Sequence, residues 1–300
     1  MSKKTALVFG GSGFIGVYLV EELFRRGYEV HIADLQSPPA LQASAAFHAL
    51  DIMNLPAVEA VVHQTQPAVI YNLAGFANLD DAVGAPLKTL NLNVVGNANL
   101  LEASRTNQVP LFIYASSAYA MSNKGSFYGI SKLTSEKIVE EYNHKYGQKF
   151  VILRYGSLYS ERYFHNNYLY KIVEMALKQN QIVHHGDGEE VREYIHAADA
   201  ARLSVDVVEQ QEYHNRHIIL TGNERMKRKE LFQMIREIIG KSDLQILLSE
   251  TPSDNHYQQT PYSFNPIVSQ KLLANPHIDM GQGILECVRS VYQSTTGHEQ

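Results

Sequence analysis

The chain has 300 residues, of which 45% are hydrophobic and 19% are charged, a composition typical of a folded protein and too apolar for intrinsic disorder. Its formal net charge of −5 comes with mixed signs and no basic stripe, which argues against nucleic acid as a partner. The single cysteine, Cys287, excludes an intrachain disulfide, and no apolar run reaches the roughly 18 residues of a membrane span, so we expect a cytoplasmic protein.

Short apolar runs alternate with helical patterns through the first half of the chain. The predicted strands are Thr5–Phe9, Glu29–Ala33, Val69–Leu73, Leu111–Ala115 and Phe150–Arg154. The predicted helices between them are Phe14–Arg26, Leu55–Gln64, Pro86–Thr106 and Tyr128–Tyr146. Strands that alternate with helices form parallel sheets covered on both faces, so the pattern predicts a doubly wound α/β fold.

The regular alternation loosens after about Tyr155. Here we expect helices over Asn166–Gln179, Ala197–Glu209 and Lys227–Ile239, a strand over His217–Thr221, a turn at His185–Gly188 and a loop over Ser249–Pro266. The run Lys227-Arg228-Lys229 opens the third of these helices and indicates a solvated face. We therefore predict a second, smaller mixed α/β domain. The larger domain is placed at residues 1–156 plus about 197–222, and the smaller one at about 157–196 and 223–300.

A glycine-rich turn connects the first predicted strand to the first predicted helix. Gly11, Gly13 and Gly16 satisfy G-x-G-x-x-G in the strand–turn–helix context that a dinucleotide-binding Rossmann domain requires. Glycines allow the backbone to approach a pyrophosphate, and the helix N-terminus offers free N–H groups to it. The cofactor contacts predicted for this turn are Gly10, Gly13, Phe14, Ile15 and Gly16. The alternative is a tight turn that binds nothing.

Asp34 ends the second predicted strand and bears on the choice of dinucleotide. A carboxylate at this point accepts hydrogen bonds from the adenosine ribose hydroxyls and repels a 2′-phosphate. No arginine follows within residues 35–40, so the sequence favours NAD over NADP. The alternative is that Asp34 is only a turn residue.

Tyr128 and Lys132 lie four residues apart near the start of a long helical pattern, so both side chains share one face. We expect the ammonium to lower the pKa of the Tyr128 phenol, which could then act as general base on a hydroxyl while hydride leaves the same carbon. Ser116 and Ser117 end a predicted strand, where a hydroxyl can orient the same oxygen. Taken alone, the Tyr and Lys spacing is also typical of a surface helix pair.

Further motifs extend over nearly the whole chain. They are Phe9–Gly16, Asp51-Ile52, Asn72-Leu73-Ala74-Gly75, Asn93–Ala103, Tyr114–Ser117, Tyr128–Lys132, Leu153-Arg154-Tyr155, Gly186-Asp187-Gly188 and Val191–Asp199. With these motifs the sequence resembles an extended short-chain dehydrogenase/reductase of the NAD-dependent epimerase/dehydratase family, which acts on nucleotide sugars.

The resemblance implies roles for residues that the patterns alone do not assign. Asp51 and Ile52 would contact the adenine, and Asn93 would support the cofactor side, where Leu73 and Ala74 also lie. The resemblance further implies a homodimer that pairs through the helices that include Tyr128–Tyr146.

The same resemblance assigns the catalytic and substrate-binding residues. Ser117 and Tyr128 would contact the reacting sugar hydroxyl, and Lys132 would hold the nicotinamide ribose and tune Tyr128. Arg192 would face the substrate diphosphate, which suits a guanidinium fork. The predicted substrate-binding residues are Ser116, Ser117, Tyr155 and Arg192. We expect no metal, because the spacing of His184, His185 and His196 fits no zinc pattern.

The residues after Ser117 separate the reactions of the family. Dehydratases carry an acidic pair there and decarboxylases a Glu, whereas this chain has Ala118 and Tyr119. We therefore expect an epimerase that oxidises C4 of a nucleotide-diphosphate sugar, lets the transient ketone rotate and returns the hydride to the other face. A one-way 4-keto reductase or 4-dehydrogenase needs the same residues and is the alternative. A non-catalytic NAD(H)-binding sensor is the third hypothesis, although such proteins typically lose the Tyr or the Lys.

Overall fold

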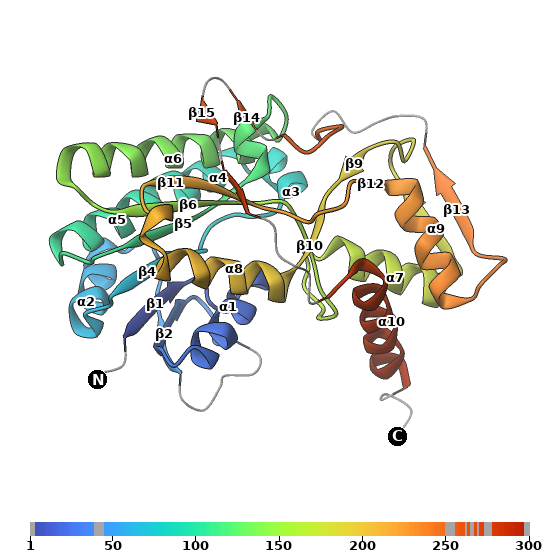
Figure 1. The fold of residues 1–300 in the computed structure, drawn as a ribbon, viewed down its shortest axis with the longest axis horizontal. Coiled ribbons are helices and arrows are strands. Elements are labelled where there is room, and N and C mark those ends of the chain that lie inside the picture. The colour runs from blue at the N-terminus through green and yellow to red at the C-terminus, as the bar shows by residue number, and fades with distance from the viewer. Residues whose placement is uncertain are drawn as a thin grey trace.

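An eight-stranded parallel sheet forms the centre of the computed structural model, in the order β16-β11-β6-β5-β4-β1-β2-β3 (Figure 1). The structure describes residues 4–38, 45–249, 256–261, 263–264, 267–268, 270–272 and 278–296. The sheet strands are β1 (Thr5–Phe9), β2 (Glu29–Asp34), β3 (Ala46–Ala49), β4 (Val69–Asn72), β5 (Phe112–Ser117), β6 (Phe150–Tyr155), β11 (Arg216–Leu220) and β16 (Gln270–Leu272). The predicted doubly wound α/β fold is confirmed, and the strand order changes direction between β1 and β4.

Both faces of the sheet are covered by helices, which explains why a central strand such as β1 is apolar on both faces. Ala6 and Val8 of β1 join one apolar cluster, while Leu7 and Phe9 join another on the opposite face. The first cluster includes side chains of α1 (Phe14–Arg25) and α8 (Ala197–Glu209). The second includes α2 (Leu55–Thr65), α5 (Gly96–Thr106) and α6 (Ser126–Tyr146), on the other side of the sheet in Figure 1.

The long helix predicted over Pro86–Thr106 is divided into three segments. α4 (Pro86–Leu90) leads into a π-helical segment, η1 (Asn91–Val95), and α5 completes the run. A π turn holds one more residue than an α turn and often marks a functional position. Here it contains Asn93, a buried polar residue that the periodicity of the sequence alone did not place.

Several short elements were not predicted. They are α3 (Leu79–Gly84), η2 (Ala118–Met121), η3 (Gln211–Tyr213), β7 (Ser157–Tyr159), β8 (Gln181–His184), β9 (Val191–Arg192), β10 (Tyr194–His196), β12 (Met226–Lys227), β13 (Gln245–Leu248), β14 (Ser263–Phe264) and β15 (Ile267–Val268), together with β3 and β16. Strands this short carry too few residues to show a period. Part of the loop expected over Ser249–Pro266 lies outside the described residues, and β14 occupies two residues of the described part.

A third apolar cluster lies apart from the two sheet layers. It joins α7 (Tyr168–Gln179), α9 (Arg228–Ile239) and α10 (Met280–Thr296), which stand together at one side of the sheet in Figure 1. On this basis we propose a two-domain division at residues 1–156 plus about 197–222, and about 157–196 plus 223–300, except that β16, within the second range, belongs to the central sheet. Within the described ranges, no helix is long and apolar enough to cross a membrane.

Candidate active site

A cavity of about 760 Å³ begins at the carboxyl ends of the central strands and extends toward α7 and α9. Open α/β sheets form their binding crevices at this place, where the strand order reverses. Every predicted site residue except Asn93 lines it. These residues are Gly10, Gly13, Phe14, Ile15, Gly16, Asp34, Asp51, Ile52, Leu73, Ala74, Ser116, Ser117, Tyr128, Lys132, Tyr155 and Arg192.

The glycine turn packs its backbone directly against the end of β4. Gly10 has a φ of 79°, and a Cβ on it would lie 2.6 Å from the backbone nitrogen of Ala74, so neither the conformation nor the space admits a side chain. No side chain caps the N-terminus of α1, which begins just after this turn. Asp34 accepts hydrogen bonds from the backbone N–H groups of Ser12 (3.0 Å) and Leu35 (2.7 Å). The carboxylate therefore fixes the glycine turn to the end of β2.

Asn93 acts from behind the cavity wall. Its Oδ1 accepts a hydrogen bond from the Phe76 N–H (2.6 Å), and its Nδ2 donates to the Ser131 hydroxyl (2.8 Å). A Cβ on Gly75, whose φ is 144°, would lie 2.5 Å from Asn93 Oδ1. Asn93 thus holds the turn after β4 against α6, an indirect form of the supporting role that the resemblance implied.

Lys132 lies beneath Tyr128 in the protein interior. Its Nζ donates to the carbonyl oxygen of Ala115 (2.8 Å) and lies 5.9 Å from the centre of the Tyr128 ring. Burial lowers the pKa of Lys132 to about 8, against the opposing charge of Glu136. The ammonium is therefore easier to deprotonate than an exposed lysine.

The pKa of Tyr128 differs from the prediction. Burial raises the pKa of the phenol above its usual value, while an interaction with the Ser117 hydroxyl acts in the opposite direction. The expected lowering by Lys132 was therefore wrong for the protein alone. Its cause is that both groups are desolvated together, so the neighbouring ammonium does not outweigh the loss of water around the phenol.

A buried carboxylate, Glu136, completes this end of the site and was not predicted. It is fully buried and forms a 2.6 Å ion pair with Arg154, and it accepts a 2.5 Å hydrogen bond from Ser116. Burial raises the pKa of Glu136, but the bonds from Arg154 and His217 outweigh this, and the pKa falls to about 2. Its position four residues after Lys132 on α6 was the available signal.

Two predicted substrate-binding residues direct their hydroxyls toward protein partners. The Ser116 hydroxyl donates to Glu136, and the Tyr155 hydroxyl lies 2.7 Å from Ser204 Oγ on α8. Both residues still line the cavity, so their contact with substrate stays a prediction. The Ser116 hydroxyl thus connects β5 to α6, and the Tyr155 hydroxyl connects β6 to α8, so both hydroxyls hold these strands in place.

Two arginines line the far end of the cavity. The guanidinium carbon of Arg192 lies 4.2 Å from the centre of the Tyr257 ring, and that of Arg228 lies 4.0 Å from the centre of the Tyr168 ring. Arg192 donates to the carbonyl oxygen of Val191 (3.0 Å), whereas Nη1 of Arg228 is buried without a hydrogen-bond partner. Among the residues that the structure describes, neither guanidinium lies within ion-pair distance of a carboxylate, although the charge of Glu190 acts on Arg228.

Arg228 corrects the interpretation of the run Lys227-Arg228-Lys229 as a solvated face. Lys227 and Lys229 do lie at the surface, where both pair with Glu189. Arg228 instead faces the cavity because it is the first residue of α9 and follows β12 directly. A run of charged residues does not show which of its side chains faces the interior, so the sequence analysis did not identify Arg228 as a site residue.

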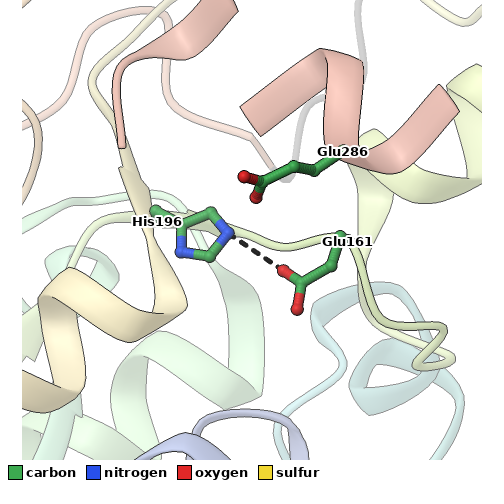
Figure 2. A group of neighbouring side chains, drawn as sticks. All are labelled: Glu161, His196 and Glu286. Carbon is green, nitrogen blue, oxygen red and sulfur yellow. Dashed lines mark hydrogen bonds and ion pairs between the residues drawn. The ribbon is translucent and has the colours of Figure 1, made fainter. Parts of the chain in front are cut away.

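A separate polar cluster lies away from the cavity lining. Figure 2 shows Glu161 after β7, His196 at the end of β10 and Glu286 on α10, with one ligand atom of each within 4.8 Å of the others. His196 Nδ1 accepts a hydrogen bond from the Ala198 N–H (3.2 Å), so the ring proton is on Nε2, which donates to Glu161 (3.1 Å). A metal bound at Nε2 would require the ring proton to move to Nδ1, where it would face the Ala198 N–H and the existing hydrogen bond would be lost. The geometry therefore assigns this cluster to hydrogen bonding.

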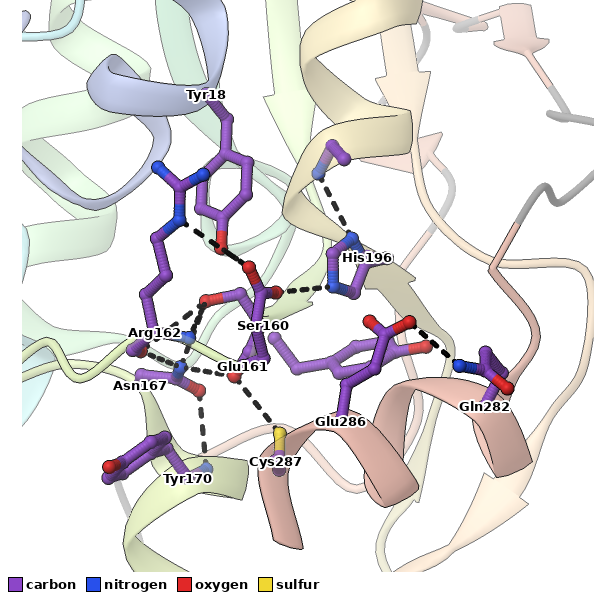
Figure 3. Close-up of polar contacts among 12 residues, drawn as sticks. Tyr18, Ser160, Glu161, Arg162, Asn167, Tyr170, His196, Gln282, Glu286 and Cys287 are labelled. Atoms are coloured by element: carbon purple, nitrogen blue, oxygen red, sulfur yellow. Dashed lines mark hydrogen bonds and ion pairs between the residues drawn. The ribbon is translucent and has the colours of Figure 1, made fainter. Parts of the chain in front are cut away.

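The same cluster connects three helices, as Figure 3 shows. Glu161 accepts a 3.0 Å hydrogen bond from Tyr18 of α1 and pairs with Arg162 (3.4 Å). Burial raises the pKa of Glu161, but the hydrogen bonds from His196, a backbone N–H and Tyr18 together with the charge of His196 outweigh it, and the pKa falls to about 2. Cys287 of α10 is buried nearby, with its thiol 3.1 Å from a backbone oxygen. This junction holds α10 against α1 and the start of α8.

Comparisons with known proteins agree with this geometry. The model of the "NAD dependent epimerase/dehydratase family" matches residues 6–221. A "Putative UDP-glucose 4-epimerase" of Methanocaldococcus jannaschii is 27% identical over 78% of this chain and 82% of its own length. The "dTDP-glucose 4,6-dehydratase 1" of Escherichia coli is 24% identical over 67% of this chain and 68% of its own.

Solved structures show the same fold over almost the full length. The UDP-glucose 4-epimerase of Thermotoga maritima with UDP-glucose has a TM-score of 0.85 and 24% identity, and the match covers 97% of this chain and 99% of that one. The UDP-glucose 4-epimerase of Thermus thermophilus in complex with NAD has a TM-score of 0.80 and 23% identity over 96% and 99%. From the family match over most of its length, the chain belongs to the NAD-dependent epimerase/dehydratase family, and it is an enzyme of the extended short-chain dehydrogenase/reductase type.

Proposed function

We propose that the protein is an NAD-dependent nucleotide-sugar 4-epimerase, which oxidises C4 of the sugar to a transient ketone and returns the hydride to the opposite face. One observation carries the proposal. A single cavity joins the glycine turn and Asp34 at one end, Tyr128 and Ser117 in the middle, and at the other end two guanidinium groups that form no ion pair with a described carboxylate. This order matches the order in which a dinucleotide, the reacting sugar and the diphosphate of that sugar would lie along the cavity.

The residues at the first end fit NAD. A side chain on Gly10 would fill the cradle, and the uncapped start of α1 offers N–H groups to a pyrophosphate. Asp34 lines the cavity where the adenosine ribose would lie and disfavours a 2′-phosphate, which makes NADP the less suitable cofactor. NAD supplies the acceptor and donor of hydride when it is bound. The relative from Thermus thermophilus, solved with NAD, supports this choice.

Tyr128 carries the proton chemistry of the proposed reaction. It takes the proton of the sugar hydroxyl as the hydride leaves C4, and it returns that proton when the hydride comes back. Ser117 interacts with Tyr128 and would hydrogen-bond to the same sugar oxygen. Because burial raises the pKa of Tyr128, the phenol needs positive charge beside it to give up its own proton. Lys132, whose Nζ lies beneath the ring, supplies that charge.

Arg192 and Arg228 would hold the substrate diphosphate. A guanidinium fork matches two phosphate oxygens, and both groups are desolvated without a carboxylate partner among the described residues. Several relatives are named for UDP-sugars, so UDP is the first nucleotide to test. Neither Ala118 nor Tyr119 offers a carboxylate for eliminating water, which argues against a dehydratase.

The test is to incubate the protein with NAD and UDP-glucose, UDP-N-acetylglucosamine or UDP-glucuronate, and to follow the sugar by proton NMR and NADH by absorbance. We expect C4 epimers to interconvert without net NADH. Tyr128→Phe should lower turnover by about 10²–10⁴-fold and leave NAD affinity nearly intact. Tyr163→Phe, a change at a side chain 61% exposed, is the matched control.

Two other outcomes identify the alternatives. Stoichiometric formation or consumption of NADH would assign a one-way 4-dehydrogenase or 4-keto reductase. Tight NAD(H) binding with no change in any sugar nucleotide would assign a non-catalytic sensor.

We further infer that two copies pair through α6, as the resemblance implied. Ile130 of α6 is 57% exposed, and Leu87 of the neighbouring α4 is 75% exposed, which leaves apolar surface beside this helix. Light scattering after size exclusion tests the pairing, and Ile130→Glu should yield monomers.

A further inference from the structure

A hydrogen-bonded chain of three side chains leads from the cavity to the protein surface. The Tyr119 hydroxyl lies 2.6 Å from His256 Nδ1, and His256 Nε2 lies 3.3 Å from Asp80 Oδ1. Tyr119 belongs to η2, Asp80 to the first turn of α3, and His256 to the segment 256–261. Tyr119 and His256 line the cavity, whereas the Asp80 side chain is 71% exposed. The mechanism proposed above uses none of them.

The fold holds the Tyr119 ring beside the proposed catalytic centre. The ring centre lies 6.1 Å from that of Tyr128 and 4.5 Å from that of Tyr257. Gly125, just before α6, has a φ of 97°, and a Cβ on it would lie 2.8 Å from the Tyr119 ring. Tyr119 therefore has a fixed position, two residues after Ser117, from which it shares one substrate space with Tyr128.

The electrostatics make Tyr119 dependent on its partner. Burial raises the pKa of the Tyr119 phenol far above its usual value, so the phenol does not ionise alone. Burial lowers the pKa of His256, against the raising effect of Asp80, so the ring is neutral, and its Nδ1, 2.6 Å from the Tyr119 hydroxyl, is placed to accept the hydrogen bond of the phenol. Asp80 then fixes the Nε2–H tautomer and stabilises the imidazolium, the arrangement of an acid–base pair with an orienting carboxylate. Arg192 and Arg228 are the nearby cations.

We propose that Tyr119, with His256 and Asp80 behind it, is a second acid–base group that moves a proton on and off a carbon adjacent to the C4 ketone. The phenol proton passes to His256 Nδ1, and the phenolate takes a proton from C3 or C5. The electron pair of that C–H bond forms the enolate, and its charge rests on the C4 oxygen. Reversal restores every atom, and no electron leaves the sugar. The proposal rests on the proposed function, because only a 4-keto sugar has such an acidified carbon.

This arrangement gives the site an activity beyond hydride transfer. C3 and C5 are each one bond from the carbon that Tyr128 serves, and Tyr119 lines the same cavity with its ring centre 6.1 Å from that of Tyr128, which suits a base for either neighbour. The enolate oxygen is the oxygen that Ser117 and Tyr128 contact, and their hydroxyls would stabilise its charge. Exchange with solvent, and inversion at that carbon, are the reactions this geometry permits.

The test supplies the ketone directly, as UDP-4-keto-6-deoxyglucose, to the full-length protein with NAD in D₂O. Proton NMR and mass spectrometry then report deuterium at C3 and C5. We expect uptake at one of these carbons well above the rate in buffer, and Tyr119→Phe should lower it by about 100-fold or more. Asp80→Asn, a surface change, should lower it less. Tyr163→Phe, at an exposed side chain, should leave it unchanged.

Three results would overturn the proposal: no uptake above buffer, equal uptake in the wild type and Tyr119→Phe, or uptake lost in Tyr128→Phe and kept in Tyr119→Phe. Asp80→Asn keeps the test decisive if Tyr119→Phe does not fold, because Asp80 lies at the surface and unchanged uptake in that variant also counts against the proposal. Inversion at C4 of ordinary UDP-sugars is measured separately, so a failed proposed function and a failed second base give different results.

Discussion

The two ends of the cavity treat buried positive charge in opposite ways. Beneath Tyr128, the buried carboxylate of Glu136 pairs with Arg154, and its charge also acts on Lys132. At the far end, Arg192 and Arg228 stack on tyrosine rings and have no carboxylate partner among the described residues. The difference separates the charges that stabilise the fold from the charges that are available to bind a ligand.

Desolvation explains the contrast. A cation taken out of water loses several kcal/mol of hydration, which a buried carboxylate can offset. A tyrosine ring offsets only about 0.5–2 kcal/mol of it. The guanidinium of Arg228, with a buried nitrogen that lacks any partner, therefore gains most from an arriving anion. The charges around Glu136 are already satisfied and should matter for folding rather than for binding.

Glu136→Gln should have the largest effect, because it leaves the buried Arg154 without its counter-charge. We expect a loss of about 3–5 kcal/mol in the free energy of unfolding, measured in denaturant. Glu140→Gln removes a half-buried neighbour that also contacts His217 and should cost far less. Similar losses in the two variants would contradict this prediction, since Glu136 would then contribute no more to stability than Glu140.

The same carboxylate predicts how stability falls in acid. The pKa of Glu136 is about 2 in the folded protein, against 4.5 for an ordinary glutamate. Its depressed pKa contributes stability that is fully present above pH 4.5 and is lost as the pH falls toward 2, on the order of 3 kcal/mol. Unfolding measured across this range should show that slope in the wild type, and Glu136→Gln should lack it.

Arg228→Met should act with the opposite sign on stability and binding. Without ligand, the free energy of unfolding should stay level or rise, because the change removes a partly buried cation that forms no ion pair with the described residues. The dissociation constant for UDP should rise by about 10–100-fold, the loss of a charge-assisted hydrogen bond. Calorimetry with UDP measures this, and Lys229→Met is the adjacent surface control. Destabilisation by Arg228→Met without weaker UDP binding would assign Arg228 to the scaffold.

The smallest expected effect concerns the charge of Lys132. Its pKa of about 8 means that the cation is lost as the pH rises through 8, well below the 10.5 of an ordinary lysine. The kcat/KM for C4 interconversion should fall on this limb, by about tenfold one pH unit above the pKa. A limb near 10.5 would show that the bound ligands restore the full basicity of Lys132.

The sequence was most informative where the determinants are local. The glycine turn, Asp34 and the Tyr128–Lys132 spacing are each contained within one strand–turn–helix unit or one helical turn, and all line the cavity as expected. Five of the strands in the first half were placed for the same reason, because a continuous apolar run needs no knowledge of its neighbours, whereas the short β3 was missed. The ends of these five strands differ from the prediction by at most two residues.

The parts that were missed depend on distance in the sequence or on burial. Tyr119 meets His256 across 137 residues, and no periodicity links them. Arg228 was interpreted from its charged neighbours, which do lie at the surface, whereas its own direction follows from how β12 enters α9. The predicted direction of the Tyr128 pKa shift was wrong because the Tyr–Lys spacing accounts for the neighbouring charge and not for the loss of water around both groups.

The sheet is completed by the most C-terminal of its strands. β16 aligns with β11 from the Ile218–Gln270 pair to the Leu220–Leu272 pair, although about 50 residues separate the two strands in the chain. During synthesis, β11 therefore emerges from the ribosome long before its outer neighbour. In that interval its backbone groups form an open template on which two nascent chains can associate. Pairing with residues 270–272 covers that edge, so β11 stays open to association with other copies until those residues have been synthesised and have folded onto it.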